Sequence, residues 1–185
     1  MRFFFYFIII LISTCTTTKF IQEEKQEATP EWGPAEISAT AEYMVGSVQE
    51  YFDRSKEKPY VELAKIQNRS SEHIETGMLT NSIVTNLLQR KIIFVDRRER
   101  ADAIKEIELG QKGIVKSDSQ LPVGELLSPN FKLSGEITDN LRYVEGDKVQ
   151  YIIVTLRLLK LSTGSIEWQA EKKFLKVSKR QRVGW

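Results

Sequence analysis

Apolar and polar residues alternate most regularly in the last long stretch of the chain, residues 149–176. The first arm has an apolar face of period two, as expected of a strand that buries one side. The residues of this face are Ile152, Val154, Leu156 and Leu158. The second arm places three residues on one face: Ile166, Trp168 and Ala170. Between the arms, Gly164 in Ser-Thr-Gly-Ser suits a tight turn, so the pattern predicts a long β-hairpin.

A third strand is predicted just before this hairpin. Residues 131–137 alternate strictly between apolar and polar side chains. Residues 145–148 (Glu-Gly-Asp-Lys) have the composition of a turn that leads into the hairpin. Consecutive strands joined by tight turns form a meander. Residues 131–176 are therefore predicted to be a three-stranded antiparallel meander.

The first half of the chain carries helical stripes. Apolar residues recur at spacings of three and four over residues 35–52 and again over residues 76–90, where Thr76 is the expected N-cap. A third helix is predicted at residues 97–109, opened by Asp96 and Glu99 as a capping pair. Its apolar face is narrow, so it should lie at the surface.

Short apolar runs at residues 60–66 and 92–95 are predicted strands, the second of them in the sheet interior. The elements together predict a single α/β domain over residues 35–178. It should have a central mixed sheet of four to five strands with the C-terminal antiparallel meander, flanked by helices. The chain is 41% hydrophobic and 28% charged over 185 residues, which suits one core without disulfides.

The N-terminus reads as a secretory signal. One Arg is followed by ten apolar residues and then by small polar ones within residues 1–14, too short for a comfortable transmembrane helix. Cys15 follows directly, as in a bacterial lipobox, so we expect it to be lipidated and to become the first residue of the mature protein. The alternative is an uncleaved anchor with an incidental cysteine.

Polar segments flank the predicted domain. Residues 15–34 are charged, lack an apolar period and are broken by Pro30, Gly33 and Pro34, which predicts the lipidated cysteine followed by a flexible tether. Residues 179–185 form a basic tail that ends in Trp185. Such a tail is either solvated or in contact with anionic lipid or peptidoglycan phosphates.

Charge and composition exclude several kinds of protein. With 27 basic and 25 acidic residues, the net charge of +2 gives no indication of nucleic-acid binding. One cysteine and one histidine, His73, allow neither an internal disulfide nor a site with two histidines. No phosphate-binding or metal motif is recognisable, so we expect no cofactor, no metal and no small-molecule substrate.

Polar residues of the kinds found in catalytic sites crowd together at Ser70, Ser71, Glu72 and His73. Catalytic triads are assembled from distant positions, because neighbours along the chain point in different directions. Side chains of these types bond readily to nearby backbone. We therefore interpret the stretch as a loop fixed by side-chain-to-backbone hydrogen bonds, with no catalytic residue.

This loop also carries a family resemblance. Residues 68–76 (NRSSEHIET), followed by Leu79 and Thr80, resemble the signature loop and helix start of the LpoB family, lipoprotein activators of penicillin-binding proteins. Residues 94–97 (FVDR) and 158–168 (LLKLSTGSIEW) resemble two further segments of that family, and the second is shared with the wider CsgG-like superfamily. The signature-loop positions are Asn68, Arg69, Ser70, Glu72 and His73.

The resemblance implies an outer-membrane lipoprotein that faces the periplasm. It would bind a bifunctional class A penicillin-binding protein and stimulate peptidoglycan synthesis, without catalytic residues of its own. Two features depart from the family. The tether is short, and residues 112–129 lack the family's usual helix pattern.

A surface for the partner is predicted on outer positions of the meander, where Arg and Tyr would serve as anchors. The predicted residues are Arg142, Tyr143, Arg157, Lys172, Lys173 and Phe174. The alternative is that these are ordinary surface and core residues.

Two other functions remain open from the sequence. A CsgG-like secretion or assembly lipoprotein would be an oligomeric structural component. An envelope hydrolase would require carboxylates that no recognisable motif brings together.

Overall fold

A computed structural model describes residues 32–179; the predicted signal peptide, Cys15 and most of the predicted tether lie outside the described residues. The helices are α1 (Pro34–Arg54), α2 (Thr76–Gln89) and α3 (Arg100–Gln111), with a short 3-10 helix at Ser117–Ser119. The strands are β1 (Tyr60–Leu63), β2 (Gln67–Asn68), β3 (Ile93–Phe94), β4 (Phe131–Val144), β5 (Asp147–Lys160) and β6 (Ile166–Ser178).

The strands form one mixed sheet of six strands. Its order is β3-β1-β4-β5-β6, and β2 pairs with β4 farther along the edge that β1 occupies. Strands β1, β2 and β3 run in parallel pairings, whereas β4, β5 and β6 are antiparallel neighbours. The α/β class, the mixed sheet and the C-terminal meander are therefore confirmed. The strand beyond the expected four to five is the two-residue β2.

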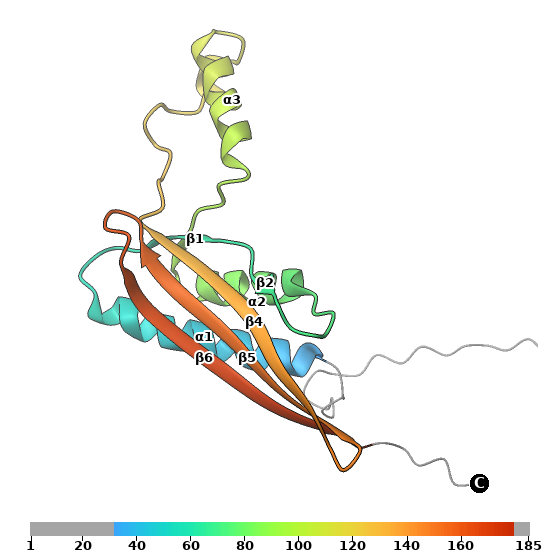
Figure 1. The fold of residues 1–185 in the computed structure, drawn as a ribbon. Coiled ribbons are helices and arrows are strands. Elements are labelled where there is room, and N and C mark those ends of the chain that lie inside the picture. Colours follow the sequence, from blue (N-terminus) through green and yellow to red (C-terminus); the bar gives the residue numbers. More distant parts are fainter. Residues whose placement is uncertain (1–31, 180–185) are drawn as a thin grey trace, which may run out of the picture.

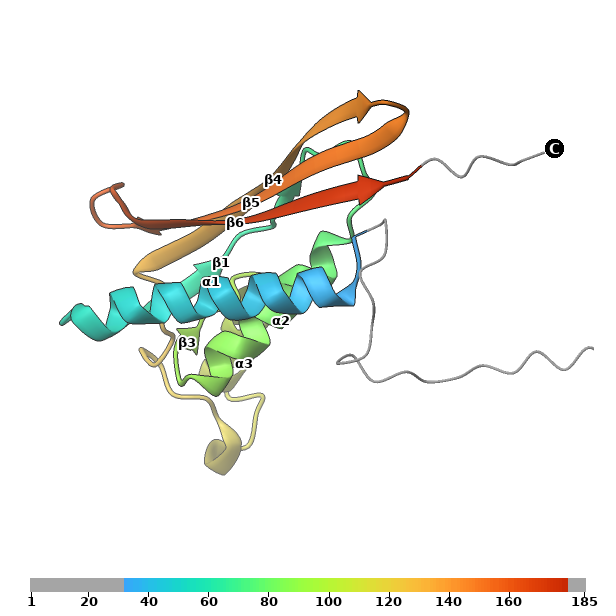
Figure 2. The same cartoon turned by 90° about the horizontal axis from the view of Figure 1, so that it is seen from below.

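Two helices cover one face of this sheet (Figure 2). The other face of the meander, called the bare face below, is covered by no helix or strand within residues 32–179. The apolar stripes predicted on α1 and α2 explain this arrangement, because they face the apolar side of β4 and β5. The buried residues of α1 and α2 include Ala41, Met44, Val45, Val48, Leu79, Ile83 and Leu87. Opposite them on the sheet lie Phe131, Leu133, Ile137, Ile152, Val154, Leu156 and Leu158. One core thus lies between a helix layer and a sheet layer.

Strand β4 is longer than the strand predicted at residues 131–137, because it continues to Val144 through mostly polar positions. Its turn at Glu145 (φ 52°) and Gly146 (φ 91°) has two positive φ values in succession, as in the turns that match strand twist. The other turn has Gly164 at φ 74°, as its sequence predicts. The β4–β5 turn extends beyond the helix layer (Figure 1).

The start of β6 differs from the prediction, because Ile166 does not share a face with Trp168 and Ala170. A register shift occurs where Leu158 pairs with Trp168 and Leu159 pairs with Ile166. Glu167, between these two pairs, is the extra residue of a β-bulge. A bulge of this kind reverses the alternation of side chains, so residues before it point to the opposite face from the one expected. Ile166 therefore lies on the bare face, whereas Trp168 and Ala170 pack against the core.

Three local predictions are wrong. The N-cap of α2 is Glu75, whose carboxylate accepts a hydrogen bond from the Gly77 N–H, and Thr76 is the first helical residue. Asp96 does not cap α3, which begins only at Arg100; its side chain instead accepts from the Arg98 N–H at 2.9 Å in a turn. The strand predicted in the interior, β3, is a half-buried edge strand.

The surface position of α3 is confirmed. Gly110 is its one buried residue, and the helix stands away from the body of the domain (Figure 1). Within residues 32–179, no helix combines the length and apolar character needed to cross a membrane.

Candidate functional site

The signature loop, residues 68–75, takes its shape from its own side chains. Asn68 Oδ1 accepts hydrogen bonds from the backbone N–H of Ser70 at 3.0 Å and from its hydroxyl at 2.7 Å. Asn68 Nδ2 donates to the carbonyl oxygen of Glu72 at 2.8 Å. These bonds confirm a loop fixed by side-chain-to-backbone hydrogen bonds.

Asp139 of β4 attaches this loop to the meander. Ser71 donates to its carboxylate twice, from the backbone N–H at 3.0 Å and from the hydroxyl. Gln150 of β5 is almost completely buried and donates its side-chain amide to the same carboxylate at 2.7 Å. One carboxylate therefore joins the loop to two strands of the sheet.

Two further contacts support the attachment. The Arg69 N–H donates to the carbonyl of Ile137 at 2.8 Å, which continues the pairing of β2 with β4. Lys148 Nζ lies 3.0 Å from Glu72 Oε1. The loop is thus held from β4 and β5, close to the end of the meander that carries its first turn.

The ionisation of Asp139 favours the attachment. Partial burial by itself would raise the pKa of this carboxyl. Hydrogen bonds from the Ser71 hydroxyl, the Gln150 amide and the Ser71 N–H, together with the charge of Lys148, outweigh burial and hold the pKa below its ordinary value. Asp139 is therefore an anion at neutral pH, which is the form that accepts all these donors.

The arrangement suits recognition. The hydroxyls of Ser70 and Ser71 are bound to Asn68 and Asp139, while His73 is exposed. Among residues 32–179, no group of three or more His, Cys, Asp or Glu side chains is placed to hold a metal ion. Arg69, with 64% of its side chain exposed, is oriented by Gln67 Oε1 at 2.9 Å. The loop presents exposed charged groups on a fixed backbone.

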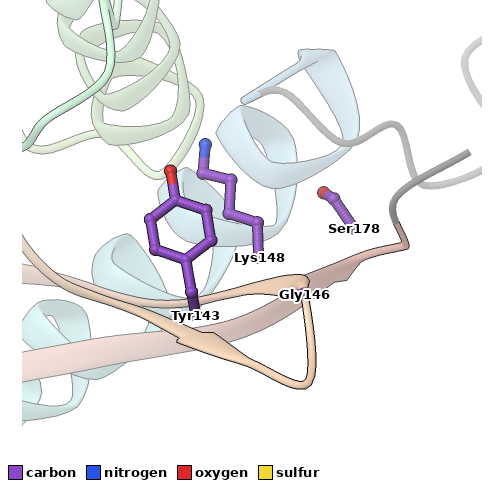
Figure 3. A pocket seen from close by; sticks show the side chains of 4 residues that line it. All are labelled: Tyr143, Gly146, Lys148 and Ser178. Carbon is purple, nitrogen blue, oxygen red and sulfur yellow. The ribbon is translucent and has the colours of Figure 1, made fainter.

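A pocket of about 420 Å³ lies beside this loop, near the turn between β4 and β5. Tyr143, Gly146, Lys148 and Ser178 line it, and the side chains of Tyr143 and Lys148 extend to the same side (Figure 3). The Lys148 amine is occupied by Glu72. The one charged side chain that lines the pocket is therefore already paired with the loop.

The predicted partner surface does not form one patch, because its six residues divide between the two faces of the meander. Directly paired residues of antiparallel strands point to the same side. Three of the six point to the face that the helices cover: Tyr143, Lys172 and Phe174. Phe174, for example, pairs with Ile152, which is buried beneath the helices.

Two of these three residues pack against helix α1 or the segment before it. The ring of Phe174 meets that of Trp32 edge-on, with centroids 5.3 Å apart. The Lys172 amine lies 5.0 Å from the ring centroid of Tyr43. Placing Phe174 and Lys172 on the outer face was therefore wrong. Tyr143 is 72% exposed because it lies beyond the helices.

Arg142, Arg157 and Lys173 do lie on the bare face, but apart from one another. Arg157 is 2.8 Å from Glu136, and Lys173 is 3.1 Å from Glu171. Arg142 donates to Asn140 at 3.2 Å and pairs in register with Val149, eight positions before Arg157 on β5. These positions lie about 27 Å apart along a strand.

Asp139, Lys148 and Gln150 were missed as parts of the site. Asp139 and Gln150 could have been noticed in the sequence. Both are polar, yet each stands at a position of the alternating pattern where an apolar, core-facing residue is expected. Asp139 continues the series of Leu133 and Ile137, and Gln150 precedes Ile152 by two. A buried polar residue needs a partner. Their partner in the loop is separated from them by 68 and 79 residues, which the sequence pattern does not specify.

Comparison with known proteins gives one family. The family model described as "Peptidoglycan-synthase activator LpoB" matches residues 36–174. A search of curated proteins finds no match.

Solved structures similar to this chain include two domains and one lipoprotein. The LpoB C-terminal domain from Salmonella enterica is 12% identical, with a TM-score of 0.44, 75% of this chain covered and 94% of that chain. The LpoB C-terminal domain from Escherichia coli is 13% identical, with a TM-score of 0.45 and coverages of 71% and 94%. Lipoprotein GNA1162 from Neisseria meningitidis is 15% identical, with a TM-score of 0.41 and coverages of 68% and 88%.

Proposed function

The chain belongs to the LpoB family of peptidoglycan-synthase activators, and we propose that it binds a bifunctional class A penicillin-binding protein and stimulates its glycan polymerisation and cross-linking. The family match over residues 36–174 carries this proposal, because it spans nearly all of the described domain. The protein would act by binding, with no catalytic residue of its own.

The proposal includes the lipid anchor. Cys15 follows an apolar signal-like stretch in the sequence. Its acylation would hold the domain at the outer membrane, facing the periplasm. Two or more acyl chains give stable attachment, because each buried methylene contributes about 0.8 kcal/mol.

The signature loop is our candidate for contact with the synthase. Asp139, Gln150 and Lys148 hold its backbone, so the exposed Arg69 is oriented before any partner arrives. A fixed loop loses less conformational entropy on binding. Arg is also a common anchor of interfaces.

The test uses the mature chain beginning at Thr16 and class A synthases purified from the same cell. Glycan polymerisation from lipid-linked precursor is followed in detergent, with and without the protein. We expect a several-fold acceleration that parallels complex formation. Absence of both binding and acceleration with every such synthase would refute the proposal.

Single substitutions locate the contact. Arg69→Ala and Tyr143→Ala remove exposed groups, and Lys105→Ala on α3 is the control because its amine is paired only with the exposed Asp102 at 3.0 Å. We expect Arg69→Ala to weaken binding roughly tenfold, as for an interface anchor. Phe174→Ala is a poor probe, since it would remove the contact with Trp32.

A further inference from the structure

One end of the domain is where the chain arrives from Cys15. The start of α1, the β4–β5 turn and the end of β6 all lie there, as both views of the ribbon show (Figures 1 and 2). Glu36 of α1 and Lys176 of β6 are joined at 2.9 Å, and the rings of Trp32 and Phe174 are in contact. The tether therefore enters the domain at this end, and α3 points away from it.

The bare face of the meander is apolar at this same end. Val149 pairs with Val177, and Tyr151 pairs with Leu175, so their side chains lie next to one another on one side of the sheet. Leu175 is 66% exposed and Val177 is 55% exposed. With Val144 of β4, these residues form what we call the tip patch: Val144, Val149, Tyr151, Leu175 and Val177.

Basic residues border the tip patch. Arg142 is the register partner of Val149, and Lys173 precedes Leu175 by two residues on the same face. Lys179 follows β6, and the sequence continues with Arg180 and Arg182. The carboxylates of Glu145 and Asp147 at the turn, and of Glu171 at 3.1 Å from Lys173, offset part of this charge. Apolar side chains bordered by cations are what an anionic lipid surface attracts.

The tether keeps the tip patch near the membrane. Residues 16–31 span at most about 55 Å when fully extended, and a flexible chain of that length has a mean span of about 22 Å. The patch lies at the end where this chain enters the domain. If the anchor pulls the domain toward the bilayer, the tip patch reaches the headgroups before α3 does.

We propose that the tip patch rests on the surface of the membrane that holds the lipid anchor, with apolar side chains at the headgroup level and Arg142, Lys173 and Lys179 against anionic phospholipid headgroups. This rests on the lipid anchor of the proposed function. Such contact orients the domain, so that α3 and the loops around it face away from the bilayer.

The test is binding to vesicles by the chain beginning at Thr16, which lacks the acylated cysteine. The vesicles contain phosphatidylethanolamine and roughly a quarter phosphatidylglycerol, and binding is measured by co-sedimentation at about 0.05 M salt. The variant is Leu175→Glu with Val177→Glu, both on the exposed side of an edge strand. The matched control is Val123→Glu with Leu126→Glu, which are 66% and 42% exposed near α3.

We expect the parent chain and the control to bind, and the tip variant to bind at least about tenfold more weakly, because two anions replace apolar contacts at an anionic surface. Vesicles without phosphatidylglycerol should bind less. An unchanged urea midpoint shows that the tip variant is folded.

Other outcomes would overturn the proposal. If the parent does not bind vesicles, or if the tip variant binds as the parent does, the patch has no lipid contact. Loss of synthase stimulation in detergent by the tip variant, without vesicle binding by the parent, would assign the patch to the synthase. Self-association of the parent that the tip variant abolishes would assign it to a second copy. Stimulation in detergent needs no bilayer, so the two proposals fail separately.

Discussion

At the scale of single residues, Asp139 is the side chain that joins the signature loop to the sheet. It lies in phase with the apolar side of β4 and accepts hydrogen bonds from both Ser71 and Gln150. Without it, the buried amide of Gln150 would keep only the longer hydrogen bond to the Ser71 hydroxyl at 3.4 Å, and a poorly paired buried donor is costly. The attachment of the loop to β4 and β5 therefore relies strongly on this carboxylate.

Asp139→Asn should destabilise the protein by about 2 kcal/mol at pH 7, because an amide offers one acceptor oxygen in place of two charged ones. The lowered pKa of Asp139 means that its contribution is present at neutral pH and is lost as pH falls through that lowered pKa, below the ordinary range. Urea unfolding from pH 7 to pH 3 should show the parent and the variant converging. Asp118→Asn, at an exposed pair with Lys116, is the control and should change stability by less than about 0.5 kcal/mol. Equal destabilisation at every pH would contradict this assignment.

Replacing either of two glycines by alanine should change the stability of the protein in opposite directions. A Cβ on Gly135 would lie 2.2 Å from Leu156 Cδ2 and 2.8 Å from the backbone oxygen of Thr155, whereas a Cβ on Gly46 would meet nothing within 4 Å. We expect Gly135→Ala to cost about 2 kcal/mol by overpacking. Gly46→Ala, inside α1, should stabilise by about 0.5 to 1 kcal/mol. Thermal unfolding of both variants measures the difference, and a stabilising Gly135→Ala would show that the β4–β5 packing has room to relax.

At the scale of elements, α1 is joined to β6 at three places along its length, in addition to the contact of Lys172 with Tyr43. Glu36 meets Lys176 at 2.9 Å, Trp168 Nε1 donates to Ser47 Oγ at 3.1 Å, and the Tyr51 hydroxyl lies 3.5 Å from Glu167. The first is the most buried, with 8% and 9% of the two side chains exposed. Edge strand β6 is therefore held to a helix as well as to β5.

Removing one partner of this buried pair should be costly. Glu36→Gln leaves the Lys176 amine buried without its carboxylate, and we expect a loss of about 3 kcal/mol. The double variant Glu36→Gln with Lys176→Met should recover part of the loss, because an apolar side chain replaces a buried charge that has lost the Glu36 carboxylate. Glu42→Gln, at an exposed position of α1, serves as the control in urea unfolding. A double variant no more stable than Glu36→Gln alone would argue against the ion pair as the cause.

Elements with a strong local period were predictable from the sequence. The stripes of α1 and α2 and the alternation of β5 determine which residues face the core, and the structure confirms them. The phase of β6 was not predictable, because the shift at Leu158 and Leu159 depends on pairing rather than on composition. The contact of Ser71 with Asp139 likewise depends on parallel pairing of β2 with β4, across 68 residues. The predicted partner surface failed for a different reason. Lys172 and Phe174 continue the alternation of Trp168 and Ala170, which already places them on the core side of β6.

At the scale of the whole molecule, the domain has two unlike ends. The start of α1, the signature loop and the tip patch lie toward the β4–β5 turn, whereas α3 and the irregular chain after it project away from that end (Figure 1). This projection carries exposed apolar side chains, among them Ile104, Ile114 and Val123. It has little packing against any other described helix or strand. The core between the two layers is therefore complete without it.

The projection formed by α3 and the chain after it should therefore be removable without unfolding the domain. Val95 N donates to the carbonyl of Val61, and Asn130 N donates to that of Tyr60, so the two ends of the projection flank β1. Strands on either side of a third lie about 10 Å apart, a gap that a short Gly-Ser linker spans. Replacing residues 98–128 by such a linker should keep one cooperative urea transition with stability within about 1 kcal/mol of the parent, because shortening a surface loop changes closure entropy only slowly. Vesicle binding by the tip patch should also persist. Loss of the cooperative transition would mean that α3 contributes to the core. Retained folding with lost synthase stimulation would instead place the partner on the end of the domain that faces away from the membrane.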